Sequence, residues 1–265
     1  MDNRYGRLSE LNIEISCKEG RTILSDVYFT PPFKIMKPFY EKGLMRILQM
    51  SASPGIMEGD CQRISVDVKT CSVAEIYSQS FEKIHKMEKG EAVRAIDINV
   101  AENSFFIYNP LPTIPYAHSA FKNTITVNLK DSFSVFIYSD ILTGGRIARG
   151  ECFDYRYYHS LVKIYENGSL SYIDNSRFTP DEMNMKGIGI YEGYTHLLSI
   201  VICNINIYDD IENIFNDYNM PFGISKNERG YIVVRVLGKS AERLGKISDE
   251  IKGIAYIKYK NEILS

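Results

Sequence analysis

The sequence predicts a mainly β protein of stacked antiparallel or mixed sheets, with a β-helix-like body and a small α+β lobe that carries two helices near the C-terminus. Three observations predict this class. Short runs of alternating or continuous apolar residues recur through the first two-thirds of the chain. Turn signals separate these runs, and the hydrophobic period changes to 3.6 residues only in the last third. Few helices between strands argue against a βαβ fold.

The strands of the body are predicted from runs that are rich in β-branched and aromatic residues. These runs cover residues 12–15, 64–68, 124–127, 133–138 and 161–165. Glycine, proline and asparagine mark the turns between them, at residues 19–20, 89–90, 109–110, 144–145 and 166–168. These residue types supply the backbone conformations that tight turns need.

The last third of the chain predicts helix, strand and helix. Residues 209–218 place apolar side chains at helical spacing after two aspartates suited to capping, and a strand follows at 231–237. Residues 239–252 read as a second amphipathic helix, with Gly253 as its stop. We therefore expect a β-sheet body over 1–196 and an α+β lobe over 197–265 packed on it. No repeat or linker separates the two.

Composition indicates a soluble globular protein, with 265 residues, 45% hydrophobic residues, 24% charged residues and a net charge of −2. Without a basic stripe, nucleic acid and anionic membranes are not expected as partners. Residues 1–7 lack the apolar run of a signal peptide, and the apolar stretch 197–207 is too short and too polar to span a bilayer. Five scattered cysteines without a CxxC pair suggest reduced thiols, so we expect a cytoplasmic location.

Motifs for catalysis are absent from the sequence. The four histidines stand outside any HxH or HExxH context, and neither a GxSxG elbow nor a phosphate-binding GxxxxGK[ST] loop occurs. We therefore expect no catalytic residues, no nucleotide binding and no tightly bound cofactor. Ligands that meet only in the fold stay open at this point.

Two glycine-rich turns carry charged residues. Gly55 and Gly59 bracket a tight turn, and Asp60 follows it. The Asp60 carboxylate either caps the N–H groups of the turn or faces a functional site.

The second turn contains Gly144 and Gly145 before Arg146. The planar guanidinium of Arg146 suits a two-point contact with Asp140 or Glu151, which favours a structural role for this turn.

Residues 105–116 combine aromatic side chains with prolines. Pro112 and Pro115 remove backbone donors and stiffen an extended path. We expect Phe105 and Phe106 in the core. The remaining aromatic residues of the segment, Tyr108 and Tyr116, either offer rigid area for a protein contact or belong to the core as well.

Five segments, in the same order, resemble the UreD (UreH) family of urease accessory proteins. They cover residues 20–40 (Gly-Arg-Thr to Pro-Phe-Tyr), 53–60 (Pro-Gly to Gly-Asp), 78–85, 110–116 and 139–151 (Gly-Arg-Ile-Ala-Arg-Gly-Glu). Two departures stand out. Glu58 replaces a glycine that is common in the family, and the chain has no tryptophan, although many members place one near residue 106.

The resemblance implies a non-enzymatic scaffold or chaperone for urease maturation and nickel insertion. Its implied partners are UreF, the GTPase UreG through UreF, and apo-urease, and a dimer of heterotrimers is one assembly that it allows. Nickel would pass in transit, for which weak carboxylate ligands are suited. Asp60 is the first candidate ligand, with Glu58 beside it and Asp140 and Glu151 as further ones. The residues that bind partners stay unassigned.

Two alternatives remain. One is a β-rich enzyme whose site assembles only in the fold, with His85, Asp60 and Glu151 as acid or base groups. The other is a plain protein-interaction module without a role in metal handling.

Overall fold

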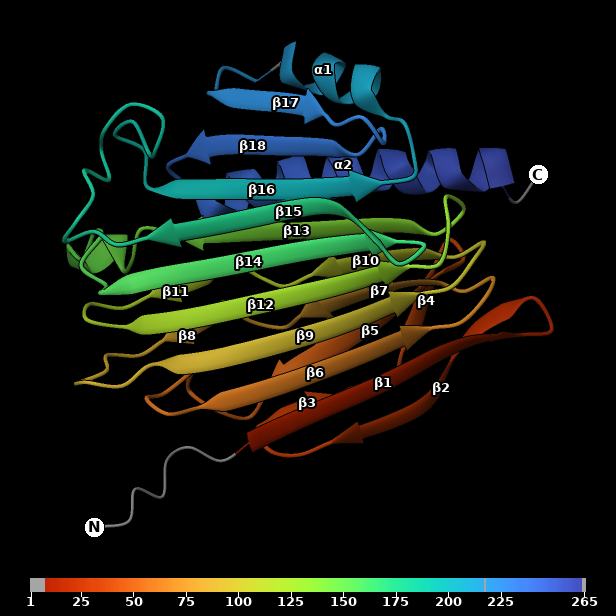
Figure 1. Ribbon diagram of the computed structural model, residues 1–265, viewed down its shortest axis with the longest axis horizontal. Coiled ribbons are helices and arrows are strands. Elements are labelled where there is room, and N and C mark those ends of the chain that lie inside the picture. Colours follow the sequence, from red (N-terminus) through yellow and green to blue (C-terminus); the bar gives the residue numbers. More distant parts are fainter. Residues whose placement is uncertain (1–7, 217, 264–265) are drawn as a thin grey trace.

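Two large mixed β-sheets dominate the molecule (Figure 1). The computed structural model describes residues 8–216 and 218–263. This part of the chain contains eighteen strands and two α-helices, and both helices lie near the C-terminus. This arrangement confirms the predicted fold class. Among the described residues, no helix has both the length and the apolar character needed to cross a membrane.

The first sheet has seven strands. In spatial order they are β15 (Ser169–Phe178), β14 (Tyr157–Glu166), β12 (Ala120–Leu129), β9 (Ala92–Val100), β6 (Cys61–Val68), β1 (Leu8–Lys18) and β2 (Arg21–Phe29).

The second sheet has eleven strands. Its main path is β17 (Phe222–Lys226), β18 (Ile232–Gly238), β16 (His196–Cys203), β13 (Val135–Thr143), β10 (Phe105–Asn109), β7 (Val73–Ser78), β5 (Leu44–Ser51) and β3 (Phe33–Ile35). Three short strands attach beside it, namely β4 (Phe39–Glu41), β8 (Glu82–Ile84) and β11 (Thr113–Pro115).

From β5 to β14 the chain passes repeatedly between the sheets, with the short strands β8 and β11 following β7 and β10 within the second sheet. Because the chain crosses to the other sheet before it returns to the next long strand, neighbouring central strands run in the same direction, as in a β-helix. The pairs β6–β9, β9–β12, β7–β10 and β10–β13 are all parallel. Antiparallel pairs lie toward the outer parts of the sheets, for example β1–β2, β14–β15 and β13–β16.

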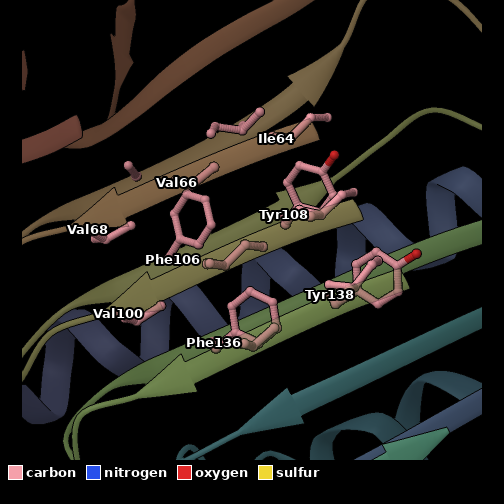
Figure 2. Packing of buried hydrophobic residues seen from close by; sticks show 14 of the residues in the cluster. Ile64, Val66, Val68, Val100, Phe106, Tyr108, Phe136 and Tyr138 are labelled. Carbon is pink, nitrogen blue, oxygen red and sulfur yellow. The ribbon is translucent and has the colours of Figure 1, made fainter. Parts of the chain in front are cut away.

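Apolar side chains from both sheets meet in one core. Figure 2 shows Ile64, Val66 and Val68 of β6 beside the aromatic rings of β10 and β13. Stacked strands bury alternate residues in this way because successive side chains point to opposite faces.

The aromatic residues of 105–116 are mostly buried. Phe105 and Phe106 are fully buried, as expected. Tyr108 is also buried, and its ring stacks on that of Tyr138 with centroids 6.1 Å apart. Of the two alternatives for Tyr108, the core position is therefore the correct one, because Tyr108 shares the inward face of β10 with Phe106. Tyr116 remains partly exposed.

Two helices cover the outer face of the second sheet. They are α1 (Tyr208–Asn216) and α2 (Ala241–Ile263). The expected stop of the second helix at Gly253 is wrong, because the buried stripe continues through Ala255 and Tyr259. Strand β16 pairs with β13, so the second sheet continues through the boundary expected near residue 196. The division into body and lobe stays a prediction.

Candidate functional site

A row of polar side chains crosses the interior at one end of the apolar core. In the first sheet, the row consists of cross-strand neighbours on β6, β9, β12 and β14, namely Gln62, Arg94, Asn123 and Ser160. Each precedes by two residues a core residue of the same strand, as Gln62 precedes Ile64. Because side chains alternate, these polar groups point into the space between the sheets.

The second sheet contributes a matching row at the same end. Gln49 pairs with Ser78 on β5 and β7, and Asp140 pairs with Ser199 on β13 and β16. Glu82 of β8 joins them through its contact with Arg94. We call these residues, together with the row of the first sheet, the polar belt.

Arg94 is the central charge of the belt. Its guanidinium is buried, donates to both carboxylate oxygens of Glu82, and contacts the Gln62 amide oxygen at 2.6 and 2.8 Å. Burial acts to lower the pKa of Arg94, but the Glu82 carboxylate outweighs it and raises that pKa. Arg94 therefore stays cationic and offsets the charge of Glu82.

Asp140 lies in the same belt, and the described part of the chain provides no ion-pair partner for it. The Tyr158 hydroxyl donates to its Oδ2 atom at 3.5 Å. Burial, followed by the nearby charge of Glu82, raises the pKa of Asp140 to about 6. At neutral pH the group is mainly a carboxylate, and it becomes a neutral acid in mildly acidic solution.

Neutral phenol groups lie close enough to interact with this carboxylate, and a neutral amide lies in the row of the first sheet. Burial raises the pKa of Tyr108 to about 12 and raises that of Tyr158, so both phenols stay protonated. Figure 2 shows the hydroxyl oxygens of Tyr108 and Tyr138 at the end of the aromatic row away from Phe106. The Asn123 Oδ1 atom is buried and has no hydrogen-bond donor in the part of the chain that the structure describes.

The belt reaches the surface on two flanks of the molecule. On the first flank, a pocket of about 110 Å³ is lined by Gln49, Gln62 and Glu82. On the other flank, Ser199 has Arg235 of β18 as its neighbour, and Arg235 donates to Asp174 of β15 at 2.7 Å. The interior row therefore runs from one side of the two-sheet body to the other.

Two of the predicted carboxylates are engaged in turns. The Met57 N–H donates to Asp60 Oδ2 at 2.8 Å, so Asp60 caps the turn. The backbone N–H groups of residues 88–90 donate to Glu58, and these bonds, with that from Glu88 first, lower the pKa of Glu58. Gly55 has a φ of +153°, and a Cβ there would collide with the Lys83 carbonyl.

The second glycine turn pairs Arg146 with Glu151 rather than with Asp140. Arg146 Nε donates to Glu151 Oε2 at 2.7 Å, and the second contact of the guanidinium is with Oε1. This contact lowers the pKa of Glu151. A Cβ at Gly144 would lie 2.9 Å from the Phe153 ring, and one at Gly145 would lie 3.0 Å from a backbone oxygen.

The prolines and His85 border the belt. The Pro112 carbonyl accepts the N–H of Glu82 at 3.0 Å, and Pro115 lies in β11 beside β8. His85 Nε2 is 3.2 Å from the Pro54 carbonyl oxygen, and the His85 ring packs on Tyr116. Of the four candidate carboxylates, only Asp140 belongs to the belt. Among the described residues, no group of three or more His, Cys, Asp or Glu side chains could hold a metal ion.

The central belt residues Arg94, Gln62, Asn123 and Glu82 were not identified from the sequence. The sequence contains one signal for them. In β6, β9 and β12, which lie side by side in the first sheet, a polar residue stands two positions before a core residue of the apolar alternation. Sequence periodicity identified the strands, but only the pairing showed that these polar residues form one row.

The fold and the belt define a two-sheet β scaffold whose interior is crossed by oxygen-bearing side chains around one arginine. The chain belongs to the family of UreD urease accessory proteins, whose sequence profile matches residues 8–257. This membership confirms the resemblance seen in the five sequence segments.

Relatives match over nearly the full length of the chain. Urease accessory protein UreD of Acetivibrio thermocellus is 41% identical over 263 residues, which cover 97% of this chain and 100% of that protein. Urease accessory protein UreH of Helicobacter pylori is 35% identical over 253 residues, covering 94% and 95%. UreD of Flavobacterium johnsoniae is 32% identical over 247 residues, covering 89% and 88%.

Proposed function

We propose that this chain is a non-catalytic urease maturation factor of the cytoplasm. In this role it binds UreF, through UreF the GTPase UreG, and apo-urease, and it helps to deliver nickel to the urease active site. Family membership supports the role in maturation. The observation that supports nickel delivery is the polar belt, which extends through the body from a surface pocket beside Gln49, Gln62 and Glu82 to Ser199, the neighbour of the exposed Arg235.

The chemistry of the belt suits a metal ion that must move on. Nickel is the cargo, and carboxylate, amide and hydroxyl oxygens bind a divalent ion less tightly than a thiolate cluster does. Asp140 supplies the negative charge, and the buried Asn123 Oδ1 supplies a neutral acceptor. Arg94 offsets the charge of Glu82, which prevents two unpaired carboxylates from trapping the ion.

Asp60, Glu58 and Glu151 remain proposed ligands near the belt. Asp60 Oδ2 accepts the turn hydrogen bond, and its other carboxylate oxygen would serve the cargo. Glu58 and Glu151 would have to exchange existing contacts with residues 88–90 and Arg146. We therefore place Asp140 first among these four residues.

Large apolar side chains on the surface support the binding of a protein partner. Several lie in the N-terminal strands and the segment between them, namely Tyr28, Phe29, Met36, Phe39 and Tyr40. Exposed apolar groups of this size on one region are typical of protein interfaces.

The test compares Asp140→Asn with Asp97→Asn in chains co-expressed with UreF and apo-urease. Asp97 is the matched control, because it lies on the exposed face of β9, the strand that carries Arg94. We expect Asp140→Asn to assemble normally but to lower the nickel content of urease several-fold when nickel is limiting. Gel filtration measures assembly, and elemental analysis of purified urease measures nickel.

Asp60→Ala forms a second arm of the same experiment. If Asp60 only caps the turn, its loss costs about 1 kcal/mol of stability and weakens assembly. If Asp60 also handles nickel, the complex forms but urease takes up nickel slowly.

Normal nickel loading of urease by an assembled Asp140→Asn complex would refute the belt as the route.

A further inference from the structure

The two sheets end at different places on one flank of the molecule. The first sheet ends at β15, whereas the second continues from β16 to β18 and β17, which Figure 1 shows beyond β15. Among the described strands, none of the first sheet lies beyond β15 to cover the inner face of β17 and β18, and β15 borders this face along one side. We call this face the shelf, and its residues are Gly223, Ser225, Val233, Arg235 and Leu237.

A groove follows the shelf alongside β15. It consists of adjoining pockets of about 360 and 450 Å³ that share Gly223 and Arg235. Residues 172–175 of β15 form one wall. A Cβ placed on Gly223 would meet no atom within 4 Å, so the space above this glycine is open. We call this feature the edge groove.

Strand β15 presents a free edge to the edge groove. Among the described strands, β15 pairs only with β14. On its other side, the Asn227 side chain donates to the Ser171 carbonyl at 3.1 Å. Beyond Ser171, Leu170 and Ile173 are 51% and 53% exposed. An edge strand with unpaired backbone groups and exposed apolar side chains is a template for pairing with another chain.

We propose that an extended segment of apo-urease adds to β15 as a further strand of the first sheet and covers the shelf. This inference rests on the proposed function, which makes apo-urease a partner. The added backbone would pair with the free edge of β15, as in other cases of strand addition. Small or apolar side chains at alternate positions would fit over Gly223, Ser225 and Val233.

Two features favour apo-urease over a permanent partner. The edge groove offers the backbone hydrogen bonds of one strand edge and is lined by polar as well as apolar residues, which suits a contact that must break after loading. The groove also contains Arg235, the neighbour of Ser199 at the end of the polar belt. A strand bound there would place apo-urease beside the Ser199 end of the proposed nickel route.

The test fills the edge groove and measures binding of apo-urease to the complex of this chain with UreF. Gly223→Leu places a side chain in the open space, and Gly245→Leu is the control, since a Cβ at either glycine meets no atom within 4 Å. We expect Gly223→Leu to raise the Kd for apo-urease at least about ten-fold and the control to leave it unchanged. Hydrogen exchange of residues 169–178 should slow when apo-urease binds.

The outcomes separate this inference from the proposed function. If the wild-type complex binds no apo-urease, the proposed function fails and the inference fails with it. If apo-urease binds, but Gly223→Leu has no effect and exchange in β15 stays fast, only the inference fails. Protection of β15 by UreF alone, or by self-association that Gly223→Leu abolishes, would also overturn the assignment to apo-urease.

Discussion

Two arginine–glutamate pairs lie on opposite faces of the second sheet. The inner pair, Arg94 and Glu82, belongs to the polar belt between the sheets. The outer pair, Arg46 and Glu75, lies on the face that α2 covers, with Arg46 Nε 2.7 Å from Glu75 Oε2. The same two residue types therefore occur in two buried environments of one molecule.

The neighbours of the two pairs differ. Glu75 also accepts a hydrogen bond from Asn109 at 3.0 Å, and the buried Lys252 of α2 lies 4.0 Å from it. The outer pair is thus part of a charge-balanced contact that fastens a helix. Beside the inner pair stands Asp140, for which the described residues provide no ion-pair partner, although the charge of Arg94 acts on it. The comparison teaches that the groups around an ion pair decide whether its surroundings are charge-balanced or contain an unpaired carboxylate.

The largest effect is expected for Arg94→Leu, which should lower the free energy of unfolding by about 3 kcal/mol, because it leaves Glu82 and Gln62 without their partner. Arg46→Leu should cost only about 1 kcal/mol, because Glu75 keeps Asn109 and Lys252. Urea denaturation of the purified chains measures both values. Equal losses in the free energy of unfolding would show that the two ion pairs contribute equally to stability, against this prediction.

A smaller effect concerns the pH dependence that Asp140 contributes. Its pKa is raised from 3.8 to about 6, so the folded state binds more protons than the unfolded state between about pH 4 and 6. The contribution of Asp140 to stability is therefore present below pH 4 and is lost as the pH rises through this window.

The measurement is the difference between the wild type and Asp140→Asn. At pH 7 the variant should be more stable by about 2 kcal/mol, and this advantage should shrink toward pH 4. Urea denaturation at several pH values gives the difference, in which other titrating groups cancel. A difference that is independent of pH would mean that Asp140 is well solvated, and the contrast between the two faces would weaken.

The smallest effect is expected for Gly253→Ala beside the outer pair. Gly253 lies within α2, where a Cβ meets no atom within 4 Å. Alanine should therefore raise the free energy of unfolding by about 0.5–1 kcal/mol through its helix propensity. Nickel loading of urease should not change, because the proposed nickel route lies on the inner face of the sheet. A loss of loading would contradict that assignment.

Local patterns predicted much of the secondary structure. The alternation at residues 64–68 lies in β6, and residues 124–127 lie in β12. The glycines at 144 and 145 proved necessary for close packing in the turn that brings Arg146 to Glu151. These features depend on a few neighbouring residues, so the sequence alone carries the information.

The candidate site could be predicted only in part. Asp140 was among the four candidate carboxylates, but Asp60, Glu58 and Glu151 turned out to be engaged in turns and an ion pair. A carboxylate after a glycine suits a turn cap and a ligand equally well. Only the three-dimensional surroundings separate the two uses.

By itself, the sequence determined that strands would dominate, where most of them lie, and which family the chain resembles. Tertiary structure alone decided that Gln62, Arg94 and Asn123 meet in one row, because a period of two shows which residues share a face but not which strand lies next. It also decided that Tyr108 is buried. The second sheet is covered on both faces at β10, so Phe105 and Phe106 are equally buried and periodicity does not tell its inner face from its outer face.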